Sequence, residues 1–234
     1  IIKIALDVSD KTNGVYDITV GSVVNNLGFG PSLFLDNQYV FESYFLKFSI
    51  DDKNKSISKH KDVVFDLSSV AKGYAVDAIS DYLLANNFNN YLIDIGGEIA
   101  ANGLSKNGIW TIGIQDPQSL QQNVSFTVPN SDKFIGVATS GDYLNFKYFD
   151  GELVSHSIDP RIIKSKVNNV LSVTVLDESS VSRADAFATA FNVLSLDESI
   201  ELSESLGIKI KIIYVSDGLI KYFESKSWQN MNHE

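Results

Sequence analysis

The stretch VVFDLSSVAKGYAVDAISDYLLANN, residues 63 to 87, constrains the fold more than any other feature of the chain. A short β-branched run leads directly into a helical segment, for which Ser68 or Ser69 is a good N-cap. The helix is expected to end between Asn86 and Asn90. Its predicted apolar stripe consists of Val70, Tyr74, Ala78, Ile79, Tyr82 and Leu83. The segment is therefore a strand that turns into a long amphipathic helix.

Strand patterns outnumber helical patterns in the rest of the chain. We expect one helix from the first residues to Gly14 and another from about Ser182 to Leu196. The segment VYDITVGSVV (15–24) indicates a turn into extended chain, and residues 51 to 62 indicate a polar loop. Further strands are expected at 38–50, 91–95, 109–115, 125–128, 133–139, 170–175 and 208–215. Because strands and helices do not alternate strictly, the sequence predicts an α+β domain.

Composition excludes several classes of protein. The chain has no cysteine, so disulfides and thiolate chemistry are absent, and a metal would need oxygen or imidazole ligands. Its formal net charge is −10 and its lysines are dispersed, which argues against nucleic acid as a partner. Its longest apolar runs fall far short of the roughly 20 residues that span a bilayer.

The segment SRADAFATAF contains two signals that compete. Ser182 and Asp185 have the spacing of a capping box, which would serve helix structure alone. Asp185 and Thr189 are also four residues apart, so both oxygens would project from one face of the helix, beside the small residues Ala186 and Ala188. A carboxylate and a hydroxyl placed in this way suit a hard cation such as Mg²⁺. The segment alone does not decide between a cap and a metal site.

Lys72 and a glycine pair are two weaker signals. Lys72 falls in the first turn of the predicted helix, where a cation is unfavourable unless it faces an anion. Gly96 and Gly97 follow a buried strand, where they could form a simple tight turn or admit a ligand. Neither the Rossmann fingerprint nor the Walker loop is present, so the standard nucleotide folds are disfavoured.

His156 is the one histidine within a patterned region, since His60 lies in a polar loop and His233 lies near the end of the chain. Its neighbours are two serines and the rigid corner Asp159-Pro160. A histidine held between turns suits proton abstraction near neutral pH. A histidine whose nitrogens are simply hydrogen-bonded to the backbone is the structural alternative.

Five ordered motifs together resemble the ApbE family of flavin transferases, the FAD:protein FMN transferases. They are DLSSVAKGYAVD (66–77), YLIDIGGEIAANG (91–103), VATSGDYLNF (137–146), HSIDPR (156–161) and ADAFATAFNVLS (184–195). An upstream stretch, TNGVYDITVGSVVNNLGFG (12–30), is similar to the same family. The resemblance implies a single domain over residues 1–234, with mixed sheet and helix layers, an active site in a cleft, and the N-terminal part of the family domain not present.

The resemblance also implies an activity and a site. Members transfer FMN from FAD to a Thr or Ser hydroxyl of an acceptor flavoprotein, such as a subunit of a membrane redox complex, and release AMP; they use Mg²⁺, or Mn²⁺ in its place. Asp185, Thr189 and the backbone carbonyl of Ala71 would hold the metal, Lys72 would face the phosphates, and His156 would be the base. The flavin pocket would be shaped by Gly96, Gly97, Glu98, Thr139, Ser140, Gly141 and Asp142.

Alternatives remain open. Some members hydrolyse FAD to FMN and AMP, and a non-catalytic flavin binder or an interaction domain of the cell envelope is also conceivable. The family usually continues Thr-Gly after DPR, whereas this chain has Ile162 and Ile163. Many members are periplasmic or envelope lipoproteins, so the resemblance implies such a location; a lipid anchor upstream of Ile1 and a cytoplasmic location both stay open.

Overall fold

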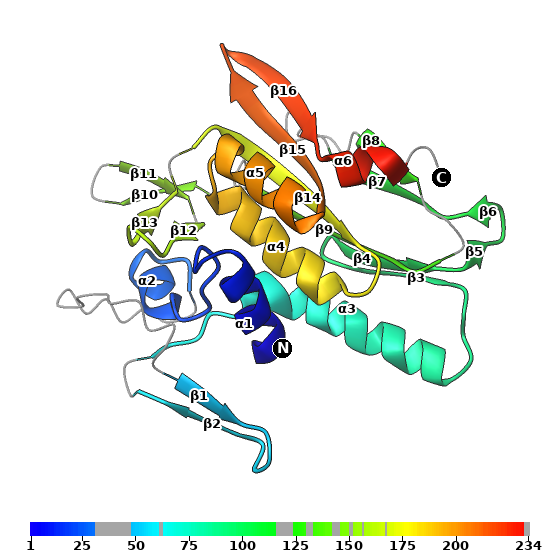
Figure 1. Cartoon of the computed structure of the whole chain (residues 1–234), viewed down its shortest axis with the longest axis horizontal. Coiled ribbons are helices and arrows are strands. Elements are labelled where there is room, and N and C mark those ends of the chain that lie inside the picture. Colours follow the sequence, from blue (N-terminus) through cyan, green and yellow to red (C-terminus); the bar gives the residue numbers. More distant parts are fainter. Residues whose placement is uncertain are drawn as a thin grey trace.

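A six-stranded antiparallel sheet forms the centre of the molecule (Figure 1). The computed structural model describes residues 1–30, 48–60, 63–115, 124–129, 133–141, 146–149, 152–155, 157–166 and 168–231. The sheet order is β16 (Leu219–Glu224), β15 (Lys209–Ser216), β14 (Val170–Asp177), β9 (Ile135–Gly141), β4 (Glu98–Asn102) and β3 (Tyr91–Ile95). With separate helices packed on this sheet, the predicted α+β class is confirmed.

The helices α3 (Ser68–Ala85) and α4 (Val181–Val193) lie side by side on one face of the sheet (Figure 1). The helix α1 (Ile2–Lys11) packs against α4, and α5 (Leu196–Leu206) packs against β15. The short helix α2 (Gly21–Asn26) follows α1. The helix α6 (Lys226–Asn230) belongs to a cluster on the opposite face. None of the helices in the described ranges is long and apolar enough to cross a membrane.

Both faces of the central strands are buried. Val137 and Leu176 pack with Trp228 of α6, whereas their chain neighbours Ala138 and Val175 pack with α4. This follows from the strand period of two, which sends successive side chains to opposite faces. The sheet therefore fixes the position of α4, and with it the residues that the sequence marks for chemistry.

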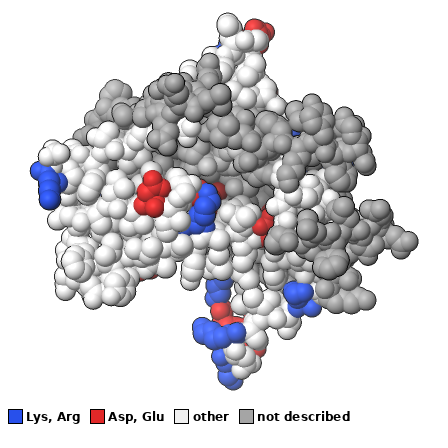
Figure 2. All heavy atoms as spheres, turned by 180° about the vertical axis from the view of Figure 1, so that it is seen from behind, with Lys and Arg blue, Asp and Glu red and all other residues white. Residues whose placement is uncertain are grey.

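Within the described ranges, five two-stranded hairpins surround this centre. They are β1 (Phe48–Asp51) with β2 (Ser56–Lys59), β5 (Leu104–Ser105) with β6 (Gly108–Ile109), β7 (Thr111–Gln115) with β8 (Val124–Pro129), β10 (Phe146–Phe149) with β11 (Glu152–Ser155), and β12 (Ile158–Asp159) with β13 (Lys164–Ser165). On the face seen in Figure 2, the β1–β2 hairpin projects at the foot of the molecule and presents both lysines and aspartates. Its second strand lies where a polar loop was expected.

Two expectations about α3 were wrong. Its N-cap is Leu67, with no side-chain cap, and the carboxylate of Asp66 instead accepts the N–H of Ser68 at 2.9 Å. The buried face of α3 also differs from the predicted apolar stripe, because Tyr74 and Tyr82 are 45% and 67% exposed. The buried positions are Val70, Gly73, Val76 and Ser80. At Gly73 the backbone of α4 approaches closely, which leaves no room for a side chain.

Other boundaries changed as well. The segment expected to be a turn into extended chain includes α2, and the helix expected to run to Leu196 ends at Val193 and is followed by a separate helix, α5. The first helix ends close to the predicted Gly14, which has a positive φ of 78°. Strands do occur at the other predicted positions, although only residues 48 to 50 of the one expected at 38–50 lie within the described residues.

Candidate active site

A cavity of about 320 Å³ lies at the N-terminal end of α3. Its walls come from α3, α4, β9, the start of β4, residues 15–24 and the segment 157–160. Seven of the residues predicted for the site line it: Lys72, Glu98, Thr139, Ser140, Gly141, Asp185 and Thr189. Four separate sequence motifs therefore meet in one cleft.

Asp185 points across the helix pair and does not cap its own helix. Its Oδ2 accepts a hydrogen bond from the backbone N–H of Gly73 in α3 at 3.0 Å. The N-cap of α4 is Ser180, whose hydroxyl accepts from Arg183 N. The capping box predicted from Ser182 and Asp185 is therefore wrong, because another residue performs that role.

The Asp185 carboxyl group is buried, with a side chain that faces the cavity. Burial raises the pKa of Asp185, while the Gly73 N–H bond and the charge of Lys72 lower it. A buried carboxylate is costly to ionise unless a cation or hydrogen-bond donors compensate it. Thr189 follows one turn later on the same helix and lines the same cavity, so its hydroxyl lies on the Asp185 face.

Lys72 and Glu98 form an ion pair in the cleft. Lys72 Nζ lies 2.5 Å from Glu98 Oε2, and Glu98 is 2% exposed while the lysine side chain is 46% exposed. Burial raises the pKa of Glu98 to about 7, and Lys72 opposes this change. The lysine thus has an anionic partner within the protein, which explains a cation near the start of a helix.

Several site residues were missed in the sequence. Tyr16 is 3% exposed, and its hydroxyl lies 2.9 Å from Ser69 Oγ; its pKa is raised by burial. Asp17 and Asp66 also line the cavity, and Asp17 is held by bonds from Thr19 N and Oγ1. Asp17 lies within the segment VYDIT, and an acidic residue among apolar neighbours is a sequence signal that could have identified it as a site residue.

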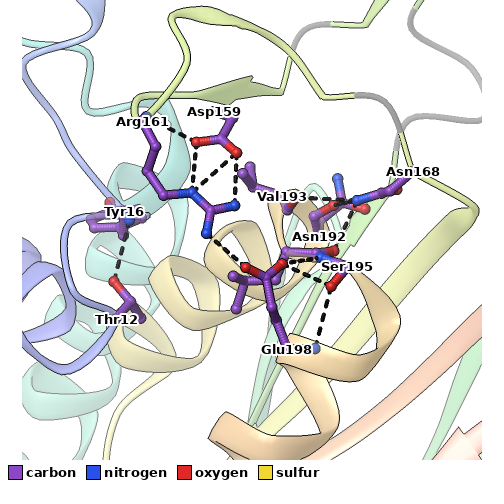
Figure 3. Close-up of polar contacts among 10 residues, drawn as sticks. Thr12, Tyr16, Asp159, Arg161, Asn168, Asn192, Val193, Ser195 and Glu198 are labelled. Atoms are coloured by element: carbon purple, nitrogen blue, oxygen red, sulfur yellow. Dashed lines mark hydrogen bonds and ion pairs between the residues drawn. The ribbon is translucent and has the colours of Figure 1, made fainter.

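The segment 157–161 forms another wall of the cleft and is fastened by a polar network (Figure 3). The Arg161 guanidinium donates to both oxygens of Asp159, and its Nη1 donates to Glu198 Oε1 at 2.8 Å. Glu198 closes the capping box of α5 with Ser195. Asn192 Nδ2 donates to Ser157 Oγ at 3.1 Å. The cleft wall is thereby tied to the end of α4 and the start of α5.

The remaining predicted residues differ in their placement. His156 and Asp142 lie outside the described residues. Gly96 and Gly97 have positive φ values of 63° and 100° and form the turn between β3 and β4. Ala71 is exposed on α3 and does not line the cavity.

The donors in the cleft suit a hard divalent cation. Asp185 supplies a carboxylate and Thr189 a hydroxyl, and Mg²⁺ prefers oxygen ligands while keeping waters and substrate phosphates. Within the described part of the chain, no three His, Cys, Asp or Glu side chains cluster as a complete metal site. The residues present that fit such an ion are Asp185 and Thr189.

The fold and cleft define an α+β protein whose cavity is lined by carboxylates, hydroxyls and a lysine. Residues 1–213 match the family model described as the ApbE family. The chain belongs to the ApbE family.

Named relatives agree with this assignment. The chain is 35% identical to the FAD:protein FMN transferase of Vibrio cholerae, over 98% of this chain and 70% of the relative. It is 30% identical to the Escherichia coli protein of the same name, over 91% of this chain and 63% of the relative. The chain thus spans about two thirds of the length of these relatives.

Solved structures show the same fold. The flavin transferase ApbE from Vibrio cholerae superposes with a TM-score of 0.82 at 34% identity, covering 98% of this chain and 74% of that one. The ApbE protein from Thermotoga maritima superposes with a TM-score of 0.80 at 27% identity, covering 100% of this chain and 77% of that one. The predicted mixture of sheet and helix layers is therefore the family fold.

Proposed function

We propose that this chain is a FAD:protein FMN transferase, which moves the FMN half of FAD onto a Thr or Ser hydroxyl of an acceptor flavoprotein and releases AMP. The observation that carries the proposal is the meeting of Asp185, Thr189, Lys72 and Glu98 in one cavity of a chain that belongs to this family. Relatives that bear the name FAD:protein FMN transferase support it.

The bond changes are those of phosphoryl transfer. The acceptor oxygen forms a bond to the FMN phosphorus, the pyrophosphate P–O bond to AMP breaks, and AMP leaves with the bridging oxygen. The acceptor proton passes to a base, for which we propose His156 on the family motif HSIDPR. A bound Mg²⁺ would neutralise pyrophosphate charge and so lower the barrier to attack.

The chain's own residues would bind and orient the substrate. Asp185 and Thr189 would hold the cation. The family resemblance adds the Ala71 carbonyl as a third ligand, although Ala71 does not line the cavity. Lys72 would add positive charge at the phosphates while Glu98 fixes its ammonium group. Thr139, Ser140 and Gly141 would line the flavin side, and Thr139 is itself held by a hydroxyl contact of 2.9 Å to Thr174.

Several finer parts of the proposal rest on the family resemblance. They are the role of Asp142, Gly96 and Gly97 in the flavin pocket, Mn²⁺ as a substitute for Mg²⁺, an acceptor subunit in a membrane redox complex, and a periplasmic or envelope location. We further propose that residues 1–234 form one domain.

AMP release from FAD by the purified chain tests the function, with Mg²⁺ or with excess EDTA, and with or without a peptide that carries an acceptor Thr. We expect metal-dependent AMP and an FMN adduct on the peptide by mass spectrometry. Free FMN in place of the adduct would indicate hydrolysis, the second candidate. No AMP release in any condition would contradict both.

Asp185→Asn is the variant that tests the proposed metal ligand. We expect it to lower AMP release by about 100-fold or more, because it removes a charge that acts on the transition state. Asp81→Asn is the matched control, since Asp81 is an exposed carboxylate on α3 that does not line the cavity. Equal activity of both variants would remove Asp185 from the proposed site.

A further inference from the structure

Asp77 of α3 binds the first turn of α4 from outside the active-site cleft. Its Oδ1 accepts from Val181 N at 2.7 Å, and its Oδ2 accepts from Ser182 N at 2.9 Å and from Ser180 Oγ at 2.8 Å. The hydroxyl of Ser182 also donates to Oδ2. One carboxylate therefore binds four donors more than a hundred residues away along the chain, two of them N–H groups that helices leave free.

A second carboxylate contact between the same helices runs in the opposite direction. Asp185 of α4 accepts the N–H of Gly73, which precedes Asp77 by one helical turn on α3. Between them the two backbones are in close contact, because a Cβ added to Gly73 would lie 2.6 Å from Val181 O and 2.8 Å from Ser182 Cα. Each helix thus presents a carboxylate to the backbone of the other. We call the pair Asp77 and Asp185, with their backbone donors, the reciprocal clasp.

We infer that Asp77 is a positioning residue for the metal-binding carboxylate of Asp185, an inference that rests on the proposed function. Asp77 holds the start of α4, and Asp185 follows one turn further along the same rigid helix. Two attachment points one turn apart fix both the slide and the rotation of α4 along α3. If the attachment at Asp77 is lost, the Asp185 side chain has to hold the two helices together and bind the cation at the same time.

Asp77 acts through the helix and touches no part of the cleft. It lines a separate cavity with Ser180 and Ser182, whereas Asp185 and Thr189 line the active-site cavity. The N-cap residue Ser180 accepts Arg183 N, whereas Asp77 accepts the N–H groups of Val181 and Ser182, so the two residues satisfy different donors of α4. Because Asp77 belongs to α3, the same bonds that satisfy these donors also fix the start of α4 against α3.

The test is a titration with Mn²⁺ alone, followed by the electron paramagnetic resonance signal of the free ion, at a temperature well below unfolding. In Asp77→Asn the amide keeps one acceptor oxygen but turns an NH₂ group toward N–H and O–H donors. We expect its dissociation constant for Mn²⁺ to rise at least about tenfold, a change of 1.4 kcal/mol. The matched control Asp81→Asn, on the same helix with the same charge change, should stay within about twofold of the wild type.

The outcomes separate two failures. A wild-type chain that does not bind Mn²⁺ would overturn the proposed metal site and the inference together. Binding by the wild type with an unchanged constant in folded Asp77→Asn would overturn the inference alone, since a variant that is merely less stable binds normally while folded. If Asp77→Asn does not fold, Ser182→Ala removes the hydroxyl bond to Asp77 and keeps the backbone bond. A rise of the dissociation constant by about threefold supports the inference, and an unchanged constant overturns it.

Discussion

At the scale of single residues, the ion pair of Lys72 and Glu98 dominates the electrostatics of the cleft. A carboxylate that is 2% exposed has lost nearly all of its water, and a half-exposed ammonium group 2.5 Å away compensates only part of that loss. The pair therefore connects the protonation state of the site to the stability of the protein.

The first prediction concerns pH. The pKa of Glu98 is raised to about 7 from 4.5, so between these values the folded protein keeps a proton that the unfolded chain has lost. The free energy of unfolding should then fall as pH rises through this window. Urea unfolding in EDTA at pH 5 and pH 8 measures the effect. Glu98→Gln should reduce the change in the free energy of unfolding between the two pH values. A change equal to that of the wild type would show that other groups cause the pH dependence.

The second prediction concerns the partner of that carboxylate. Lys72→Met keeps the apolar stem of the side chain but leaves Glu98 buried without its cation. We expect the free energy of unfolding to fall by about 2 kcal/mol at pH 8. This is less than the cost for a fully buried pair, because the lysine is half exposed. The double variant with Glu98→Gln should recover part of the loss. A double variant as unstable as Lys72→Met would show that the charge is not the cause.

At the scale of the elements, the ends of α4 and α5 hold one wall of the cleft. Asn168 Nδ2 donates to the carbonyls of Asn192, Val193 and Leu194, which are among the last acceptors that a helix leaves free. Lys166 adds its ammonium group at Asn192 O, where a cation suits the negative end of the helix.

The third prediction follows from these carbonyls. Asn168→Ala should destabilise the protein by about 1 to 2 kcal/mol, because buried acceptors lose their donor. Asn168→Asp should be worse at pH 7, since it places a carboxylate against three carbonyl oxygens. Chemical denaturation of both variants gives the order, and an Asp variant that is more stable than the Ala variant would contradict it.

The fourth prediction concerns Glu198, whose pKa is lowered to about 2, first by its bond from Arg161 and then by the N–H of Ser195. A lowered carboxyl pKa stabilises the fold above pH 4.5, and the benefit disappears as pH falls from 4.5 toward 2. Because the side chain is 45% exposed, the effect should be below about 1 kcal/mol. The free energy of unfolding of Glu198→Gln, measured between pH 4.5 and 2, should lack this loss of stability. A loss equal to that of the wild type would contradict the prediction.

At the scale of the whole molecule, the site depends on how closely the two helices approach above the sheet. Gly73 is buried at this contact, and the nearest atoms to an added Cβ belong to the backbone of α4 and cannot rotate away. Strands β9 and β14 support α4 from below, so separation of the helices would also disturb the core.

The fifth prediction is therefore that Gly73→Ala destabilises the protein by about 3 kcal/mol or more, as overpacking against backbone does, even though Ala is the better helix former by about 1 kcal/mol. The control Ala78→Gly, on the exposed side of α3, should cost only about 1 kcal/mol. Thermal unfolding compares the two, and a neutral Gly73→Ala would contradict the close contact.

The sequence by itself determined the α+β class, most strands and the order of the motifs, because strand and helix periods and motif spacing are local properties. Seven residues that the family resemblance implied for the site line the cleft, whereas Tyr16, Asp17 and Asp66 were missed. It did not determine which face of α3 is buried, since Gly73 and Ser80 carry no apolar signal, and the exposed Tyr82 carries a strong one. The tertiary structure alone decided that Asp185 binds Gly73 and that Glu98 is buried against Lys72. Those choices depend on the packing of segments distant in the chain, and no local pattern records such contacts.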